Sequence, residues 1–409
     1  MIVRLGLLAV LLLSAAPETA RAGPFEDGFA AFSRADYQTA LRLWEPLGQK
    51  GDRDAQFNLG VMNARGHGVP QNFATAGRWY LLAAQQGHTK AQFNLATQYT
   101  NGQGVQQNYT EAAKWYRLAA EQGHSVAQSN LGIQYAHGQG VQQNYTEAAK
   151  WYRLAAGQGN AVAQSNLGVL LANGQGVQQD YFEAVKWYRL AAEQGDASAQ
   201  TNLGLMYDRG RGVPQNCAEA MTWYLLAAGQ GYANAQHNLG LIYYEGKIVR
   251  ENRTEAAKWY RLAADQGLAV AQYNLGVMLS KGEGVPQNYA EALKWYLLAA
   301  DQNHASAQNN IGYMYMKGHG VSQHYAEAVK WYRLSAEQGY TNAQNNLGFM
   351  YLNGLGVPRN YVQALTWFNL ASAAGDAVAE KNRRDTSSRM TPAQIGEAQR
   401  LAAVWKPKR

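Results

Sequence analysis

Apolar and small residues return along the chain with a period of 36 positions. Within one period, Ala127, Leu131 and Tyr135 are spaced four apart, which indicates one face of an α-helix. Gly138 and Gly140 follow this stretch, and glycine readily takes the left-handed conformation that ends a helix. The first part of each period therefore predicts a helix that stops at a glycine-containing loop.

The second part of each period predicts another helix. It begins at a polar residue followed three positions later by Glu, as at Asn144 and Glu147, which is the pattern of a capping box. The helix then carries Trp151 and Tyr152 between alanines and ends at Gly159. Runs of β-branched residues and period-two alternation are absent, so the unit is a helical hairpin and not a propeller blade. The same polar–Glu pair recurs at Asn108/Glu111, Asp180/Glu183, Asn216/Glu219, Asn252/Glu255 and Asn288/Glu291.

Tryptophan marks the register, since it recurs every 36 residues without an insertion. Counted from the Ala-Gln pair, the units are 55–90, 91–126, 127–162, 163–198, 199–234, 235–270, 271–306, 307–342 and 343–378. Residues 23–54 predict an atypical capping hairpin, because a solenoid must cover its exposed ends. Residues 379–409 predict a C-terminal capping helix, starting after Thr391, and a basic tail in which Lys406–Arg409 is free. The fold class is therefore an all-α solenoid of about ten helical hairpins.

Two columns of the repeat have a structural interpretation. The Trp and the following Tyr or Phe in the second helix of each unit are expected in the core between helices. A glycine in the middle of most first helices is expected to allow close helix approach, because it otherwise weakens a helix. These glycines are Gly60, Gly132, Gly168, Gly204, Gly240, Gly276, Gly312 and Gly348.

Composition and charge exclude several classes of protein. The chain has 409 residues, of which 47% are hydrophobic, and this is the composition of a globular protein. Its net charge of +7 is concentrated in residues 379–409, which contain eight Lys and Arg residues and three acidic residues. The repeats are nearly neutral, so they lack the basic face of a nucleic-acid-binding protein. One cysteine, Cys217, excludes a disulfide framework and a cysteine-based zinc site.

The first 22 residues have the pattern of a secretory signal peptide. Arg4 precedes an apolar run over residues 5–13, and Ala20-Arg21-Ala22 resembles a cleavage site. The run is too short to span a bilayer, and no other stretch reaches that length. We therefore expect export, to the periplasm or, alternatively, into the medium, with no integral membrane segment.

Catalytic and cofactor motifs are absent from the sequence. There is no Ser-x-x-Lys and no Gly-x-Ser-x-Gly, and the eight histidines form no His-x-x-x-His pair. The Gly-x-Gly loops follow a helix and not a strand, unlike phosphate-binding loops. We therefore predict no catalytic residue, no metal ligand and no cofactor, and no enzymatic activity.

The recurring motifs resemble those of a known family. Ala-Gln-x-Asn-Leu-Gly, Gly-x-Gly-Val-Pro-Gln-Asn-Tyr and Ala-x-x-Trp-Tyr-x-x-Ala-Ala are similar to Sel-1-like repeats over residues 55–378. These repeats are relatives of tetratricopeptide repeats. The resemblance implies a right-handed α/α superhelix that binds other proteins as an adaptor. An exported bacterial branch with paired cysteines in each repeat is linked to β-lactam binding or hydrolysis, and this chain lacks those cysteines.

The outward side of the first helices is the expected partner-binding surface. Counting Ala of Ala-Gln as position one, helical spacing places position three on the outward side, with position seven beside it. Position seven alternatively packs on the preceding hairpin. Asn at position four pairs with the backbone of an extended peptide or, alternatively, holds the neighbouring loop. The candidate residues are Phe57, Phe93, His237 and Tyr273 at position three, Tyr313 and Phe349 at position seven, and Asn94, Asn130, Asn166, Asn202, Asn238 and Asn274 at position four.

The repeat is least regular in units five and six. Cys217 and Arg253 replace the aromatic residue that otherwise follows the helix cap, and Ile248 replaces the second loop glycine. This region is a candidate kink or specificity region, or is simply packed less tightly. We expect a monomeric, non-catalytic scaffold that binds a protein or peptide. The alternatives are a β-lactamase-like hydrolase and an adaptor for envelope polysaccharide assembly.

Overall fold

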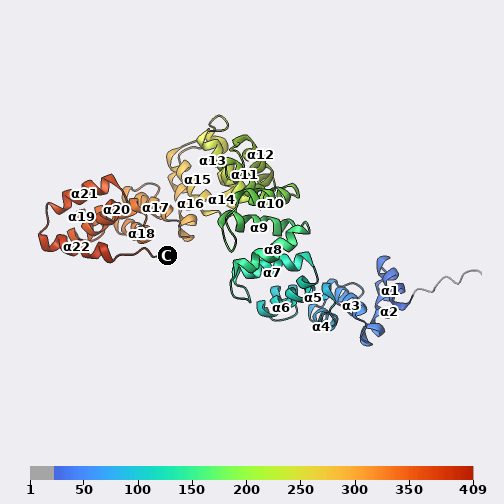
Figure 1. The fold of residues 1–409 in the computed structure, drawn as a ribbon. Coiled ribbons are helices and arrows are strands. Elements are labelled where there is room, and N and C mark those ends of the chain that lie inside the picture. Colours follow the sequence, from blue (N-terminus) through green and yellow to red (C-terminus); the bar gives the residue numbers. More distant parts are fainter. Residues whose placement is uncertain (1–22, 409) are drawn as a thin grey trace, which may run out of the picture. The chain divides into compact units, whose positions relative to one another are not determined.

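The computed structural model describes residues 23–408, which contain 22 α-helices and no strand. The helices follow one another in pairs (Figure 1), and each pair packs against the next pair within its part of the chain. This confirms the predicted all-α class and the hairpin unit. The expected signal peptide, residues 1–22, lies outside the described residues. The chain divides into two compact units, Met1–Gln179 and Asp180–Arg409.

The first unit begins with a hairpin that has its own core. The buried ring of Trp44 lies against Phe25 and Phe32, and its indole N–H donates to the Phe25 carbonyl at 3.1 Å. Repeats with a first helix (helix A) and a second helix (helix B) follow. The helices of this unit are α1 (Pro24–Ser33), α2 (Tyr37–Gln49), α3 (Arg53–Arg65), α4 (Phe73–Gln85), α5 (Thr89–Asn101), α6 (Tyr109–Glu121), α7 (Ser125–His137), α8 (Tyr145–Gly157) and α9 (Ala161–Asn173).

The second unit continues the alternation, from the helix B α10 to the helix B α20, and ends with one more pair. The last helix starts at a true capping box between Thr391 and Gln394. The helices are α10 (Tyr181–Glu193), α11 (Ala197–Arg209), α12 (Cys217–Gly229), α13 (Ala233–Glu245), α14 (Arg253–Asp265), α15 (Ala269–Lys281), α16 (Tyr289–Asp301), α17 (Ala305–Lys317), α18 (Tyr325–Glu337), α19 (Thr341–Asn353), α20 (Tyr361–Ala373), α21 (Ala377–Ser387) and α22 (Pro392–Val404).

The helix B caps form only in part as predicted. Asn144 accepts from the backbone N–H groups of Thr146 and Glu147, so the Asn half of the motif is present. The predicted role of Glu is wrong for these helices. The Glu147 side chain, for example, forms no hydrogen bond with the backbone N–H of the cap residue Asn144. A positively charged partner is available one turn along, and Glu147 lies 3.8 Å from Lys150.

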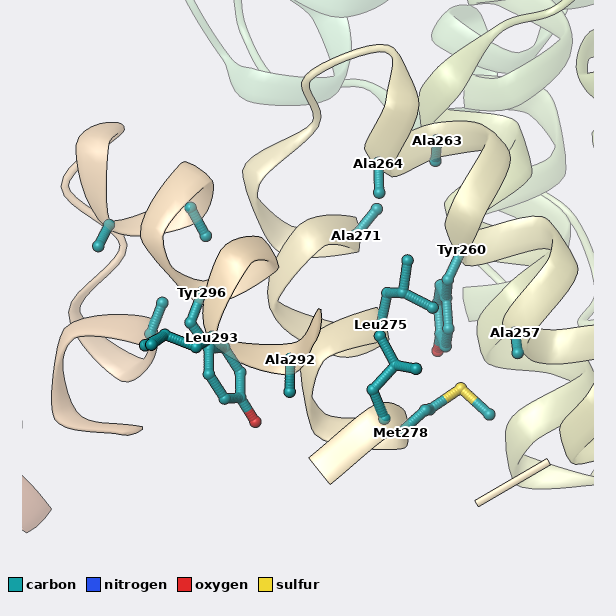
Figure 2. Packing of buried hydrophobic residues seen from close by; sticks show 14 of the residues in the cluster. Ala257, Tyr260, Ala263, Ala264, Ala271, Leu275, Met278, Ala292, Leu293 and Tyr296 are labelled. Carbon is teal, nitrogen blue, oxygen red and sulfur yellow. The ribbon is translucent and has the colours of Figure 1, made fainter. Parts of the chain in front are cut away.

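In most repeats the tyrosine of helix B lies in the core, which continues from one hairpin into helix A of the next. Tyr260 of α14 lies with Leu275 and Met278 of α15 in one buried cluster, which Figure 2 shows from close by. The predicted close approach at the glycine column is confirmed. A Cβ atom built on Gly132 would lie 2.6 Å from the ring of Tyr152, closer than real contacts allow.

The tryptophan column is less buried than expected. Among its members only Trp151 and Trp367 are buried, and the others are half-buried. Since Trp precedes Tyr by one residue, it lies about 100° around the helix from the buried tyrosine. Trp115 packs instead against the core of the preceding repeat. The tryptophans therefore close the contact between repeats, and the tyrosines fill the hairpins.

A ladder of buried glutamines joins successive hairpins. Gln128, the Gln of the Ala-Gln pair, is 4% exposed and donates to the Ala120 carbonyl at 3.0 Å. Its own side-chain oxygen accepts from Gln158 of the next helix B at 2.8 Å. Equivalent pairs in the same repeat positions are Gln86/Gln56, Gln122/Gln92, Gln230/Gln200, Gln266/Gln236, Gln302/Gln272 and Gln338/Gln308.

The expectation of a free C-terminal tail is wrong for the described part of it. The ring of Trp405 meets that of Trp367 edge-on at 6.1 Å. The backbone N–H of Lys408 donates to the Glu337 carbonyl at 2.8 Å, and its ammonium group lies 2.9 Å from the Glu337 carboxylate. The segment is therefore held in place by the ring of Trp367 and by the Glu337 carbonyl at the end of α18.

Candidate functional site

On α13, α17 and α19, the most exposed large apolar side chain of helix A is the one at position seven. Leu241, Tyr313 and Phe349 are 39%, 43% and 42% exposed. The other apolar residues at this position, for example Val277, are half-buried. Packing on the preceding hairpin, the alternative interpretation, therefore does not remove these side chains from solvent.

Two cavities open between successive A helices in the second unit. The first, of about 290 Å³, lies between α11 and α13, and the second, of about 270 Å³, lies between α15 and α17. Both are bordered by the position-seven side chain, Leu241 or Tyr313, and by the Asn at position four of the same helix. The lining residues that correspond in the two cavities are Asp208/Ser280, Arg209/Lys281, Cys217/Tyr289, Tyr224/Tyr296, Asn238/Asn310, Leu241/Tyr313, Ile242/Met314 and Lys247/His319.

Position three does not face outward as helical spacing predicted. Ser129 is 2% exposed, and Phe57 lies 6.1 Å from the ring of Tyr80 and stacks on His88 at 4.4 Å. The prediction assumed that only the hairpin's own core buries helix A. In the structure the next repeat also covers this side of the helix.

The other aromatic residues at position three have the same environment. Phe93 stacks on His124 at 4.6 Å, and Tyr273 stacks on His304 at 4.8 Å. His237 lies 5.6 Å from the ring of Tyr260. All three side chains are half-buried.

Each stacked histidine also caps the helix that it precedes. The Nδ1 atoms of His88 and His124 accept from the N–H groups of Ala91 and Ala127 at 3.1 and 3.2 Å. Burial lowers the pKa of both histidines, and Asp54 opposes this for His88. The neutral ring with a free Nδ1 lone pair is the form that can accept this bond.

The asparagines at position four are half-buried and contact the preceding repeat. Asn274 lies 3.1 Å from Nε2 of His237, so the structure brings these two candidate residues together. Burial raises the pKa of Tyr80 to about 12, and a hydrogen bond with Asn94 acts in the opposite direction. These contacts reach the neighbouring helices and not the neighbouring loop. Asn130, Asn166 and Asn202 are also half-buried, and Asn238 borders the first cavity.

Helix B carries an exposed apolar column that was not predicted from the sequence. Its members are leucines three residues after the tryptophan, each between 42% and 49% exposed. Shallow hollows lie beside Leu154 and Leu298. The regular recurrence of Leu on the charged side of helix B was the available indication. The column comprises Leu82, Leu118 and Leu154 in the first unit and Leu190, Leu226, Leu262, Leu298 and Leu334 in the second.

Between residues 23 and 408, no group of three or more His, Cys, Asp or Glu side chains is placed to hold a metal ion. None of the helices in the described part of the chain has the length and apolar character needed to cross a bilayer.

Comparison with known proteins identifies the repeat. The model of the family described as Sel1 repeat matches residues 53–88, 89–124, 125–160, 161–196, 197–232, 233–268, 269–304, 305–340 and 341–376. The matched stretches run from the start of each helix A to the residue before the next one. No curated protein matches the chain.

Two solved structures are similar to the chain at more than 30% sequence identity. One is c5321, a protective antigen present in uropathogenic Escherichia coli strains that displays an SLR fold. It is 34% identical, with 93% of this chain and 91% of that chain covered and a TM-score of 0.60. The other is a Sel1 repeat protein from Oxalobacter formigenes, 36% identical over 59% of this chain and 97% of that chain, with a TM-score of 0.54.

Proposed function

The chain belongs to the Sel1 repeat family, and on this premise we propose that it is a non-catalytic scaffold that binds a protein or peptide along its A helices. The observation that carries the proposal is the pair of cavities between successive A helices. Each cavity combines an apolar side chain at position seven with an amide at position four. Such a mixture suits side chains and backbone of a bound polypeptide.

The A helices are favoured over the leucine column of helix B because their exposed side chains differ between repeats. Where position seven is exposed it holds Leu241, Tyr313 and Phe349, so these three repeats offer different surfaces. The helix B column offers leucine throughout. Recognition of one partner among many requires contacts that differ along the surface.

The proposed place of action is outside the cytoplasm, in the periplasm or the medium. The support is the sequence of residues 1–22, with its early Arg4, short apolar run and Ala20-Arg21-Ala22. Fractionation of cells expressing the full chain tests this directly. The mature protein, beginning at Gly23, should be found outside the cytoplasm, and an uncleaved cytoplasmic chain would contradict the proposal.

Matched surface variants test the binding face. The first carries Leu241→Ser with Tyr313→Ser on the A helices, and its control carries Leu226→Ser with Leu298→Ser on the B helices. All four side chains are between 39% and 49% exposed, so both variants should fold. Each is used as bait in an extract of the native cell envelope, and captured proteins are identified by mass spectrometry.

The A-helix variant should lose the partner that the unsubstituted protein captures, and the B-helix control should keep it. Equal helical circular dichroism of the two variants excludes unfolding as the cause of a loss. Loss in the control and retention in the A-helix variant would contradict the proposed face.

A further inference from the structure

The residue after each helix B cap is normally aromatic, and its ring packs on the loop of the next repeat. Tyr37 stacks on His67 at 4.5 Å, and Tyr289 stacks on His319 at the same distance. In both pairs the partner is 30 residues further along, between the two loop glycines. This column, which we call the ring column, comprises Tyr37, Phe73, Tyr109, Tyr145, Tyr181, Cys217, Arg253, Tyr289, Tyr325 and Tyr361.

Arg253 departs from the ring column but fills the same place. Its guanidinium group lies over the ring of Tyr244 at 3.9 Å. It also pairs at 2.6 Å with Glu283, the middle residue of the next Gly-x-Gly loop. A planar cation and a carboxylate therefore replace the ring and its stacking partner.

Cys217 is the member of the ring column whose side chain is too small to fill the place. One sulfur atom stands where a phenol ring stands at Tyr289. The loop opposite differs too, since Ile248 replaces the second glycine. In another repeat a Cβ on the equivalent Gly140 would meet the backbone of Tyr109, so an isoleucine here requires a different loop position. The first cavity, of about 290 Å³, lies at Cys217 and Ile248.

We propose that this cavity is a binding site for a phenol-type aromatic ring supplied from outside the chain. Its apolar walls are Leu205, Leu241, Ile242 and Ile248. Arg209, Gln215 and Glu245 also border the cavity, so its walls are partly apolar and partly polar, and a ring that carries a hydroxyl group suits such a lining. Asp208, Asn238 and Lys247 also line it and offer donors and acceptors for a hydroxyl group.

The ring can come from a free phenol or from a tyrosine of the bound partner. The second source rests on the proposed scaffold function and would place one partner tyrosine between α11 and α13. The first source does not depend on that function. The proposed ring site and the proposed scaffold function can therefore be disproved separately, because binding of a free phenol is measured without a partner protein.

Protection of Cys217 from a thiol reagent tests the site. Cys217 is the one cysteine of the chain, so alkylation by N-ethylmaleimide, followed by intact mass, reports on this cavity alone. Adding p-cresol, the tyrosine side-chain analogue, should slow the alkylation at least tenfold and saturably. The same chain unfolded in urea is the control, and its rate should not change. An unchanged or non-saturable rate in the folded protein would overturn the proposal.

Refilling the cavity gives a second test. Saturation-transfer NMR should show p-cresol bound more tightly to the Cys217→Ser variant than to Cys217→Tyr, in which the chain supplies its own ring, as it does at the smaller cavity beside Tyr289. Equal binding to both would overturn the proposal. Both variants must show the same helical circular dichroism, which excludes misfolding as the cause of a difference. The alkylation test does not depend on either variant. N-acetyltyrosinamide, tested in parallel, binds if a polypeptide tyrosine fits, and binding of p-cresol alone assigns the site to a free phenol.

Discussion

At the residue scale, the fold depends on a close fit between a glycine in helix A and a tyrosine in helix B. A Cβ on Gly132 would lie 2.6 Å from the Tyr152 ring, and the same is found at Gly240 and Tyr260, at 2.5 Å. The glycine weakens its own helix, so its benefit is the approach of the ring. Ala96, which holds this position in one repeat, shows that the neighbouring ring can adjust at some cost.

We predict that Gly132→Ala destabilises the protein, although alanine is the better helix former. The added methyl group must displace the Tyr152 ring, which should cost about 1–3 kcal/mol. Gly157→Ala is the matched control, because nothing lies within 4 Å of its Cβ position in helix α8. The control should gain up to about 1 kcal/mol. Urea denaturation of both variants measures the difference, and a stabilised Gly132→Ala would contradict the fit.

The histidine caps predict a loss of stability at mildly acidic pH. Burial lowers the pKa of His124 in the folded protein below its usual 6.5. The unfolded chain therefore takes up the proton first as the pH falls. The contribution of the neutral ring is complete above pH 6.5 and is lost as the pH falls through 6.5 toward the lower folded pKa.

His124→Asn isolates this effect, since Asn160 caps the equivalent helix by its side chain. The variant should keep the cap, which contributes about 0.5–2 kcal/mol. Its free energy of unfolding should fall less between pH 7 and pH 5 than that of the unsubstituted protein. Chemical denaturation across this range provides the measurement, and identical pH profiles would refute the role of His124.

At the scale of the element, neighbouring hairpins are joined by amide pairs as well as by apolar packing. Gln128 both donates to the Ala120 carbonyl and accepts from Gln158. Its burial is tolerable because each polar group has a partner. This explains why an amide residue stands beside the buried alanine in every repeat.

Gln128→Met should therefore destabilise the protein, although methionine has a similar length and is more apolar. The Ala120 carbonyl would keep its bond from the backbone N–H of Gly123, and the Gln158 amide its bond to the Leu154 carbonyl. Loss of the two bonds to Gln128 should cost about 0.5–1.5 kcal/mol each.

Gln142→Met, at an exposed loop position, is the control and should change stability by less than about 0.5 kcal/mol. Thermal unfolding of the two variants measures the difference. Equal unfolding midpoints would contradict the role of the buried glutamines in joining the hairpins.

The elements were predictable because their boundaries depend on local residues. Asn and glycine at fixed spacing locate helix starts and stops, and each repeat provides an independent copy of the evidence. The side of helix A was harder to predict. Ser129 and Phe57 at position three are covered by the adjacent repeat. The sequence of one repeat does not indicate how the adjacent repeat packs against it. The leucine column was missed because single exposed leucines have no distinctive local pattern.

At the scale of the whole molecule, stability in a repeat array is expected to be local, because each repeat contacts its neighbours. Within the second unit, the C-terminal end is closed by α21, α22 and the segment around Trp405. The edge contact between Trp405 and Trp367 protects the last helix B from solvent. The exposed Lys408–Glu337 ion pair should contribute little by comparison.

Truncation after Val404 tests this local dependence. Amide hydrogen exchange in α18 and α20 should become faster, because Trp405 and the bond from Lys408 to Glu337 are lost. Exchange in α11 and α12, far along the same unit, should be unchanged and is the internal control. Faster exchange throughout the unit would contradict local stability.

The central claim is that a partner lies along the A helices, and site-specific photo-crosslinking tests it most directly. A photoreactive amino acid is placed at Leu241 or Tyr313 on the A helices, or at Leu262 or Leu298 on the B helices, and irradiated in the native envelope extract. The account predicts a covalent adduct with one partner from positions 241 and 313 and none from 262 and 298. Adducts from positions 262 and 298 alone would contradict it.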